Sequence, residues 1–143
     1  EDWDFLRFFA PAATNSDPRI NRVLIRLASD QGKLETASIT PGYLTKERIS
    51  KLQEADKLVM EALQTLGPDN LVWQCPTVLL PLSVNCEGEE SIVLRPISST
   101  NVMTANFTEL PWDGIQKLAK KLLEISGISA VFYDITNKPP GTI

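Results

Sequence analysis

The sequence from residue 131 to its last residue reads Val131-Phe132-Tyr133-Asp134-Ile135-Thr136-Asn137-Lys138-Pro139-Pro140-Gly141-Thr142-Ile143. Apolar Val131, Tyr133 and Ile135 stand at every second position, and this period of two predicts a strand with two differently solvated faces. The strand is expected to end before the two prolines, which cannot donate a backbone hydrogen bond. The stretch therefore predicts a final strand followed by a stiff basic tail, residues 136–143.

The tail has two interpretations. Pro139 disfavours helical conformation at Lys138, so we expect residues 138–140 to be extended. An already stiff segment loses little entropy when it is held in one shape, so it could present the Lys138 ammonium and the Thr142 hydroxyl to an anionic ligand. Alternatively, the tail is an ordinary frayed chain end.

The composition indicates one globular domain. The chain has 143 residues, of which 43% are hydrophobic and 22% are charged, and this is enough to build a hydrophobic core. The net charge of −4 argues against a surface that binds nucleic acid or anionic membranes in general. No apolar run approaches the roughly 20 residues of a membrane span, and there is no signal-peptide pattern.

Cysteine and histidine usage excludes several classes of site. The two cysteines, Cys75 and Cys86, are too few for a disulfide framework, and we interpret them as reduced thiols in the cytosol. We expect Cys75 to pack as a small hydrophobic residue. There is no histidine, so a Ser-His or Cys-His nucleophile pair and a mixed Cys/His zinc site are excluded. Phosphate-binding GxxxxGK[ST] and GxGxxG loops are also absent.

The first third of the chain predicts a helix, a loop and a strand. The aromatic stretch Asp2–Ala10 has Trp3, Leu6 and Ala10 at helical spacing, and residues 11–18 have the composition of a loop. The remaining aromatics of the helix belong either to the core, which we favour, or to an interface: Phe5, Phe8 and Phe9. Alternation over residues 21–28 predicts a strand, with Arg22 and Arg26 on its outer face as solvated charges or as contacts to a phosphate or a partner.

The rest of the chain predicts two large amphipathic helices separated by strands. Apolar residues at three- and four-residue steps mark helices from Thr45, a plausible N-cap, to Leu66 and from Pro111 to Ile125. Strands are expected over residues 72–84, 91–97 and 129–135. The prolines Pro76 and Pro81 place the first of these at a sheet edge or mark a bulge.

This order of elements predicts an α+β fold, a two-layer sandwich in which both large helices cover one face of a mostly antiparallel sheet. We expect residues 1–143 to form one domain, with residues 1–18 as an N-terminal helix and loop. The other sheet face needs a cover. It could come from the N-terminal aromatic residues, from the rest of a longer polypeptide, or from a second copy of the chain.

Two polar residues within apolar surroundings are candidate ligand contacts. Arg95 points the same way as apolar neighbours on its strand, so it should meet a carboxylate, a carbonyl or a ligand phosphate. Asp134 is the candidate structural partner, and we slightly favour this pair over a ligand contact. Gln74 begins an apolar strand and is explained as the polar boundary of that strand, while a ligand contact is an equal alternative that only the family resemblance described next implies.

Several motifs resemble the C-terminal part of glutamine-hydrolysing GMP synthetases, in its longer, eukaryotic-type form. The run from Tyr133 to Ile143 resembles the signature with which that family closes, although the family normally continues into Glu-Trp-Glu. Further similar elements cover most of the chain: Val93-Leu94-Arg95, Met103-Thr104-Ala105, Gly127-Ile128-Ser129 and, more weakly, Gln74-Cys75-Pro76, Thr40-Pro41-Gly42-Tyr43-Leu44-Thr45, Asp2-Trp3 and Asn21-Arg22-Val23.

The resemblance implies a role in making GMP from XMP, ATP and glutamine. In that family the glutamine amidotransferase site and the ATP-pyrophosphatase site lie in preceding domains, and ATP and magnesium bind there. The sequence motifs of these two sites do not occur in this sequence. The resemblance therefore implies a homodimerising, XMP-binding segment that is not catalytic by itself. The residues implied to contact XMP are Lys138, Pro139, Pro140, Gly141, Thr142, Gln74 and Arg95. The alternative is a free-standing, non-catalytic dimerisation or nucleotide-binding module related to these enzymes.

Overall fold

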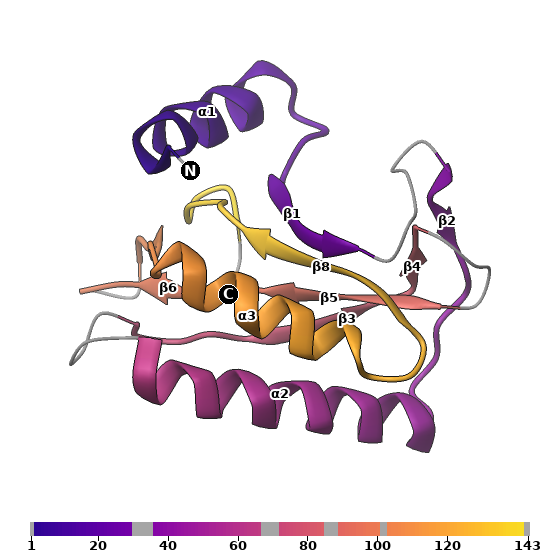
Figure 1. Cartoon of the computed structure of the whole chain (residues 1–143). Coiled ribbons are helices and arrows are strands. Elements are labelled where there is room, and N and C mark those ends of the chain that lie inside the picture. Colours follow the sequence, from indigo (N-terminus) through magenta and orange to yellow (C-terminus); the bar gives the residue numbers. More distant parts are fainter. Residues whose placement is uncertain (1, 30–35, 67–71, 85–88, 101–102, 142–143) are drawn as a thin grey trace.

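The computed structural model describes residues 2–29, 36–66, 72–84, 89–100 and 103–141 (Figure 1). Its helices are α1 (Trp3–Ser16), α2 (Lys46–Leu66) and α3 (Trp112–Leu123). Its strands are β1 (Leu24–Ser29), β2 (Ser38–Ile39), β3 (Thr77–Leu80), β4 (Leu82–Ser83), β5 (Glu90–Leu94), β6 (Ile97–Ser98), β7 (Asn106–Phe107) and β8 (Ile128–Asp134).

A four-stranded sheet in the order β1-β8-β5-β3 forms the centre of the molecule. The outer pairs, β1 with β8 and β3 with β5, are antiparallel, whereas the central pair β5 and β8 is parallel. Every residue of β8 is buried, so the prediction of two differently solvated faces is wrong. The period of two instead separates two apolar faces, because β8 has a neighbouring strand on each side and packed side chains above and below.

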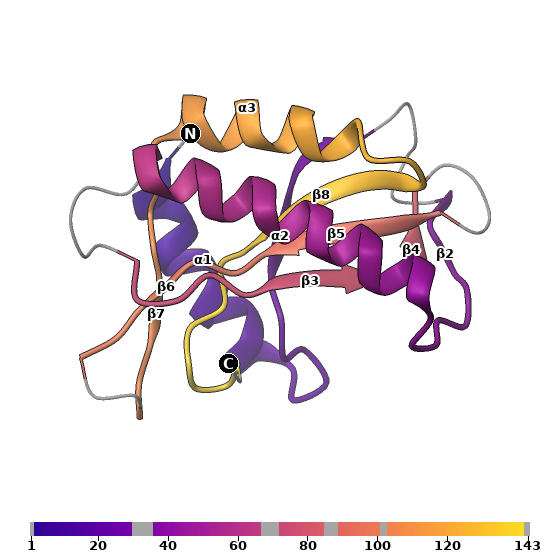
Figure 2. The same cartoon turned by 90° about the horizontal axis from the view of Figure 1, so that it is seen from below.

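The two large helices lie on the same side of this sheet (Figure 2), which confirms the predicted α+β arrangement. The predicted stripe of the second helix is buried at Ile115, Leu118 and Leu122, and these side chains pack into one cluster with Val131 and Tyr133 of β8. The predicted cap of α2 is also confirmed, because the Arg48 amide donates to Thr45 Oγ1 at 3.3 Å.

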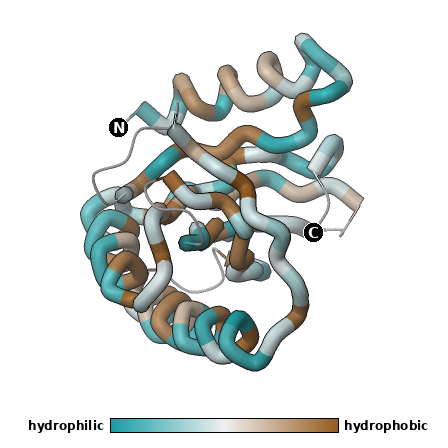
Figure 3. The backbone as a smooth tube through the Cα atoms, turned by 90° about the vertical axis from the view of Figure 1, so that its right-hand side faces the viewer, coloured by the Kyte–Doolittle hydropathy of each residue, from teal (hydrophilic) through white to brown (hydrophobic). Residues whose placement is uncertain are grey.

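The opposite face of the sheet carries a second, smaller apolar cluster. Val84, Val93, Ala130 and Phe132 are its buried members, and it is surrounded by partly exposed side chains of Leu24, Ala37, Val78, Leu80 and Leu82. In Figure 3 the brown, apolar segments run through the strands in the interior, while the outer helices alternate between teal and brown. The N-terminal aromatic residues do not cover this face, since Trp3 and Leu6 pack into the cluster on the α2 and α3 side.

The first helix is longer than its sequence pattern predicts. Residues 11–16 continue α1 instead of forming the expected loop, with Pro11 inside the helix. The hydroxyl of Thr14 donates to the carbonyls of Ala10 at 3.2 Å and Pro11 at 3.1 Å. The alanines that follow the proline favour a helix, and Ala10 and Thr14 are buried, so packing outweighs the missing proline donor.

The apolar run over residues 72–84 divides at Pro81. Before it, β3 is the edge strand of the main sheet; after it, β4 pairs with β2 in a separate two-stranded sheet. The predicted edge position is confirmed, and it agrees with the need of proline for a position outside a central ladder. Within the described ranges, no helix is both long enough and apolar enough to cross a membrane.

Candidate anion-binding pocket

Three strand ends meet at one end of the main sheet. In the antiparallel register Leu24 of β1 faces Asp134 of β8, while in the parallel register Leu94 of β5 faces Tyr133 of β8. Arg22, just before β1, and Arg95, just after β5, are therefore brought to either side of Asp134. The two arginines are 73 positions apart in sequence, and only the sheet order brings them together.

Asp134 is the shared acceptor of this cluster. Its Oδ2 accepts Arg22 Nη1 at 3.0 Å and Arg95 Nε at 3.1 Å, and its Oδ1 accepts the Thr136 amide at 2.9 Å. The Asp134 side chain is 4% exposed, whereas those of Arg22 and Arg95 are 28% and 19% exposed. The predicted pairing of Arg95 with Asp134 is thus confirmed, and Arg22 joins it.

The two guanidinium groups carry like charges and repel each other. Burial lowers the pKa of Arg95, the positive charge of Arg22 lowers this pKa further, and Asp134 partly restores it by its charge and hydrogen bond. An arginine remains charged at neutral pH even so. Two cations are therefore held side by side by one carboxylate, and an added anion between them would reduce their repulsion.

The tail after β8 is held against the rest of the fold. Ile135 donates its amide to Val23 O at 3.0 Å, and the backbone of Lys138 exchanges hydrogen bonds of 2.8 and 3.2 Å with Ala105. The side chain of Asn137 accepts the Phe107 amide at 3.1 Å. Residues 135–138 are therefore fixed between the start of β1 and the β6–β7 hairpin, which argues against the frayed-end interpretation for this part of the tail.

The prediction that residues 138–140 are extended is confirmed at Lys138, which forms an antiparallel β-bridge with Ala105, but it is wrong for Pro139 and Pro140. Pro139 and Pro140 form a turn, which is closed by the Gly141 amide donating to Asn137 O at 3.0 Å. Proline fixes φ but leaves ψ to its surroundings, so the anchored Lys138 and the turn hydrogen bond decide the path. The turn returns Gly141 to the arginines, and a Cβ at this position would lie 2.9 Å from Arg22 Nη1.

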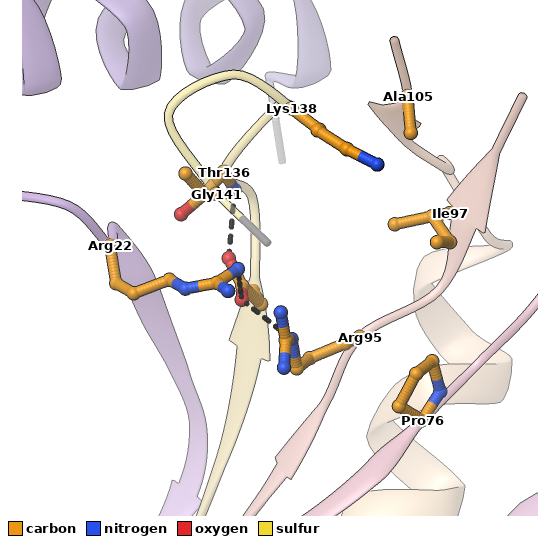
Figure 4. Close-up of a pocket in the computed structure, with 9 residues that line it drawn as sticks. Arg22, Pro76, Arg95, Ile97, Ala105, Thr136, Lys138 and Gly141 are labelled. Carbon is orange, nitrogen blue, oxygen red and sulfur yellow. Dashed lines mark hydrogen bonds and ion pairs between the residues drawn. The ribbon is translucent and has the colours of Figure 1, made fainter. Parts of the chain in front are cut away.

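These elements enclose a small pocket (Figure 4). Figure 4 shows Arg22 and Arg95 pointing toward one another across the end of β8, while the Lys138 side chain extends from the tail toward Ala105. Three cationic side chains and one carboxylate contribute to its lining, which leaves two net positive charges at neutral pH. The complete lining consists of Arg22, Pro76, Arg95, Ile97, Ala105, Asp134, Thr136, Lys138 and Gly141.

The residues implied by the family resemblance fall into three groups. Arg95, Lys138 and Gly141 line the pocket. Pro139 and Pro140 are exposed in the turn and do not contribute to the lining. Gln74 is exposed as well, although its backbone pairs with Ile97, which does line the pocket. Thr142 lies outside the described residues.

Six residues of the lining are not among the residues implied to contact XMP, and three of these six are polar. The sequence predicts Arg22 as a solvated charge or as a contact to a phosphate or a partner, Asp134 as the structural partner of Arg95, and Thr136 as part of the tail without a role of its own. The sequence does contain a signal for the contact between Asp134 and Thr136, because an aspartate side chain often accepts a hydrogen bond from the backbone amide two positions later. The position of Arg22 depends on the β1–β8 register, which the sequence does not specify.

Cys75 does not line this pocket. Burial raises the pKa of the Cys75 thiol to about 12, so this residue is an inert, packed thiol, in agreement with the expectation from sequence. Cys86 lies outside the described residues. Among the residues that the structure does describe, no cluster of three or more histidine, cysteine, aspartate or glutamate side chains could hold a metal ion.

Comparison with known proteins identifies the family. The family model described as GMP synthase C terminal domain matches residues 61–143. The chain belongs to this family. The match includes the four pocket residues on β8 and its tail together with Pro76, Arg95, Ile97 and Ala105, while Arg22 lies outside it.

Full-length relatives extend the similarity beyond the matched residues. A probable glutamine-hydrolysing GMP synthase of Leptospira interrogans is 39% identical over 142 residues, which is 99% of this chain and 23% of that protein. The glutamine-hydrolysing GMP synthase of Streptomyces avermitilis is 43% identical over 110 residues, which cover 71% of this chain and 21% of that protein. The chain thus spans less than a quarter of the length of these relatives.

Proposed function

We propose that this chain is the dimerising, XMP-binding domain of a cytoplasmic GMP synthase, and that the pocket at the end of β8 receives the phosphate of XMP. The observation that carries the proposal is that Arg22, Arg95 and Lys138 line one pocket that has a single carboxylate, Asp134. Guanidinium groups form directed, charge-assisted hydrogen bonds with phosphate oxygens, and a lysine adds a mobile point charge.

The proposed role of the domain is to hold the substrate. In the complete polypeptide, ammonia from glutamine would replace an ATP-activated oxygen of XMP in the preceding domains, with magnesium bound there. This segment would contribute the position of the nucleotide, because a bound and oriented substrate needs no further diffusional encounter. The tail residues 136–141 supply Lys138 and a buried Gly141 backbone for that purpose.

The proposed dimer uses the sheet face opposite α2 and α3. Its cluster around Phe132 and Val93 is bordered by partly exposed Leu24, Val78 and Leu80, which a second copy would cover by a two-fold contact of like with like. Analytical ultracentrifugation should give twice the mass of this 15.9 kDa chain. Val78→Lys should return a monomer, and a wild-type monomer at all concentrations would refute the dimer.

Calorimetric titration with XMP tests the nucleotide site. We expect saturable binding of XMP and none of xanthosine, which lacks the phosphate. Lys138→Met should weaken binding by roughly tenfold or more, the value of one charge-assisted contact. Lys117→Met is the matched control, because Lys117 is exposed on α3, and it should change the affinity less than about twofold.

The outcomes separate the alternatives. Equal affinity for XMP and xanthosine, or equal effects of the two lysine substitutions, would contradict the phosphate assignment. A chain that dimerises without binding XMP would instead be a non-catalytic dimerisation module related to GMP synthases. The intact mass of the natural gene product decides whether catalytic domains accompany it, since the matched region covers only 23% and 21% of these two relatives.

A further inference from the structure

Helix α1 is apolar on two opposite sides. Its inner side packs into the main cluster through Trp3, Leu6 and Ala10. The second side consists of Phe5, Phe8, Phe9 and Ala12, at the spacing of i, i+3, i+4 and i+7. We refer to these four residues as the outer stripe.

The outer stripe is exposed. The three phenylalanines are 57%, 77% and 44% exposed in sequence order, and the rings of Phe5 and Phe9 stack with their centroids 5.7 Å apart. Ala12 is also exposed. Large apolar side chains are usually buried, and a contiguous apolar patch of this kind marks a contact surface.

The orientation of the stripe follows from how α1 is anchored. The ring of Trp3 contacts the rings of Phe107, Trp112 and Tyr133, with centroids 5.7 to 6.1 Å apart. Arg7 Nε donates to Glu109 Oε1 at 2.6 Å. These contacts fix the rotation of the helix about its axis. Since the inner residues pack against the rest of the domain, the phenylalanines point outward.

The position of α1 in the chain indicates what covers it. In Figure 1, α1 lies at the top edge of the molecule and α2 at the bottom edge. It is the first element, and elements that are adjacent in sequence usually pack together. The match to the relative from Leptospira interrogans covers 99% of this chain, α1 included, but only 23% of that relative. Because the family is a C-terminal domain, the further sequence of such a relative lies mainly before α1.

We propose that the outer stripe of α1 docks against the part of a GMP synthase polypeptide that precedes it. The contact is apolar, made with aliphatic or aromatic side chains that enclose Phe8 at its centre, and it joins this domain rigidly to its upstream neighbour. A helix that is apolar on both sides is stable when it is enclosed from both. This inference rests on the family membership and not on nucleotide binding.

The test measures the accessibility of position 8 in two polypeptides. Phe8→Cys is introduced into the 143-residue chain and into the complete natural gene product, and the rate of maleimide labelling at that position is measured by peptide mass spectrometry. Peptide resolution separates it from Cys75 and Cys86. Leu44→Cys is the matched control, because Leu44 is an equally large apolar residue that is 87% exposed.

We expect position 8 to react about ten times or more slowly in the complete gene product than in the 143-residue chain, because labelling then requires local opening. Position 44 should react at similar rates in both. Equal rates at position 8 would overturn the proposal, as would a gene product with no sequence before α1. Protection that is already present in the 143-residue chain and is lost on dilution would also overturn it, in favour of a contact between two copies.

Discussion

Replacement of Asp134 by asparagine removes the charge that holds the pocket together while keeping the size of the side chain. Asp134 accepts three hydrogen bonds, two from arginines at 3.0 and 3.1 Å and one from the Thr136 amide at 2.9 Å. The asparagine carbonyl can take the place of only one of the two carboxylate oxygens, so it can accept either from the Thr136 amide or from the arginines. Arg22 and Arg95 would then lie next to each other without a counterion.

The structure sets the size of the effect. A hydrogen bond to a charged group contributes about 1.5–3 kcal/mol net, and breaking a buried ion pair by removing one partner costs about 3–5 kcal/mol. The arginines are 28% and 19% exposed, so solvent screens part of the interaction. We therefore expect Asp134→Asn to lower the free energy of unfolding by about 2–4 kcal/mol.

Urea unfolding followed by circular dichroism at pH 7 measures this change. Asp17→Asn is the control, because Asp17 pairs with Arg19 at the surface, and its effect should be much smaller. The double variant Asp134→Asn/Arg95→Met should lose at least about 1 kcal/mol less than the sum of the single variants. A loss below about 0.5 kcal/mol for Asp134→Asn, or additive single effects, would refute the role assigned to Asp134.

Three further predictions follow from close contacts and from burial. Gly141→Ala should weaken XMP binding more than it lowers stability, because its Cβ would lie 2.9 Å from the flexible end of Arg22; unchanged calorimetric affinity would contradict this. Gly114→Ala should cost about 1–3 kcal/mol, because its Cβ would lie 1.9 Å from Leu66 Cδ2, and Leu66→Ala in the same chain should recover part of it in urea unfolding. The Cys75 thiol ionises near 9.0 when unfolded but at about 12 when folded, so its stabilising effect is present below pH 9 and is lost above it. Between pH 8 and pH 10 the free energy of unfolding should fall by roughly 1 kcal/mol more in the wild type than in Cys75→Ala, and equal losses in both chains would contradict the assignment.

The helices and the fold class were accessible from sequence because they depend on local periodicity. Each of two confirmed features is a pattern within a single helix: the apolar stripe of Ile115, Leu118 and Leu122 in α3, and the cap at Thr45 of α2. The same local reasoning was misleading at Pro11, where the sequence suggests a loop and tertiary packing of Ala10 and Thr14 continues the helix. Helix propensity is a weak guide at such positions because burial can outweigh it.

The pocket was only partly accessible from sequence, because it depends on strand register. The sequence indicated that Arg95 needs a partner and that Asp134 could provide it. The contribution of Arg22 required the order β1-β8-β5, which no local pattern specifies. The path of the tail was also mispredicted, since proline chemistry restricts Lys138 but does not reveal its pairing with Ala105. Phe5, Phe8 and Phe9 were expected mainly in the core and are exposed.

The most direct test of the account is a two-dimensional amide NMR titration of the chain with XMP. We expect that the signals that shift most belong to residues lining the pocket, above all Arg22, Arg95, Thr136, Lys138 and Gly141, and that xanthosine leaves them unchanged. No saturable shift at these residues, or shifts centred elsewhere in the molecule, would contradict the claim that this pocket receives the nucleotide phosphate.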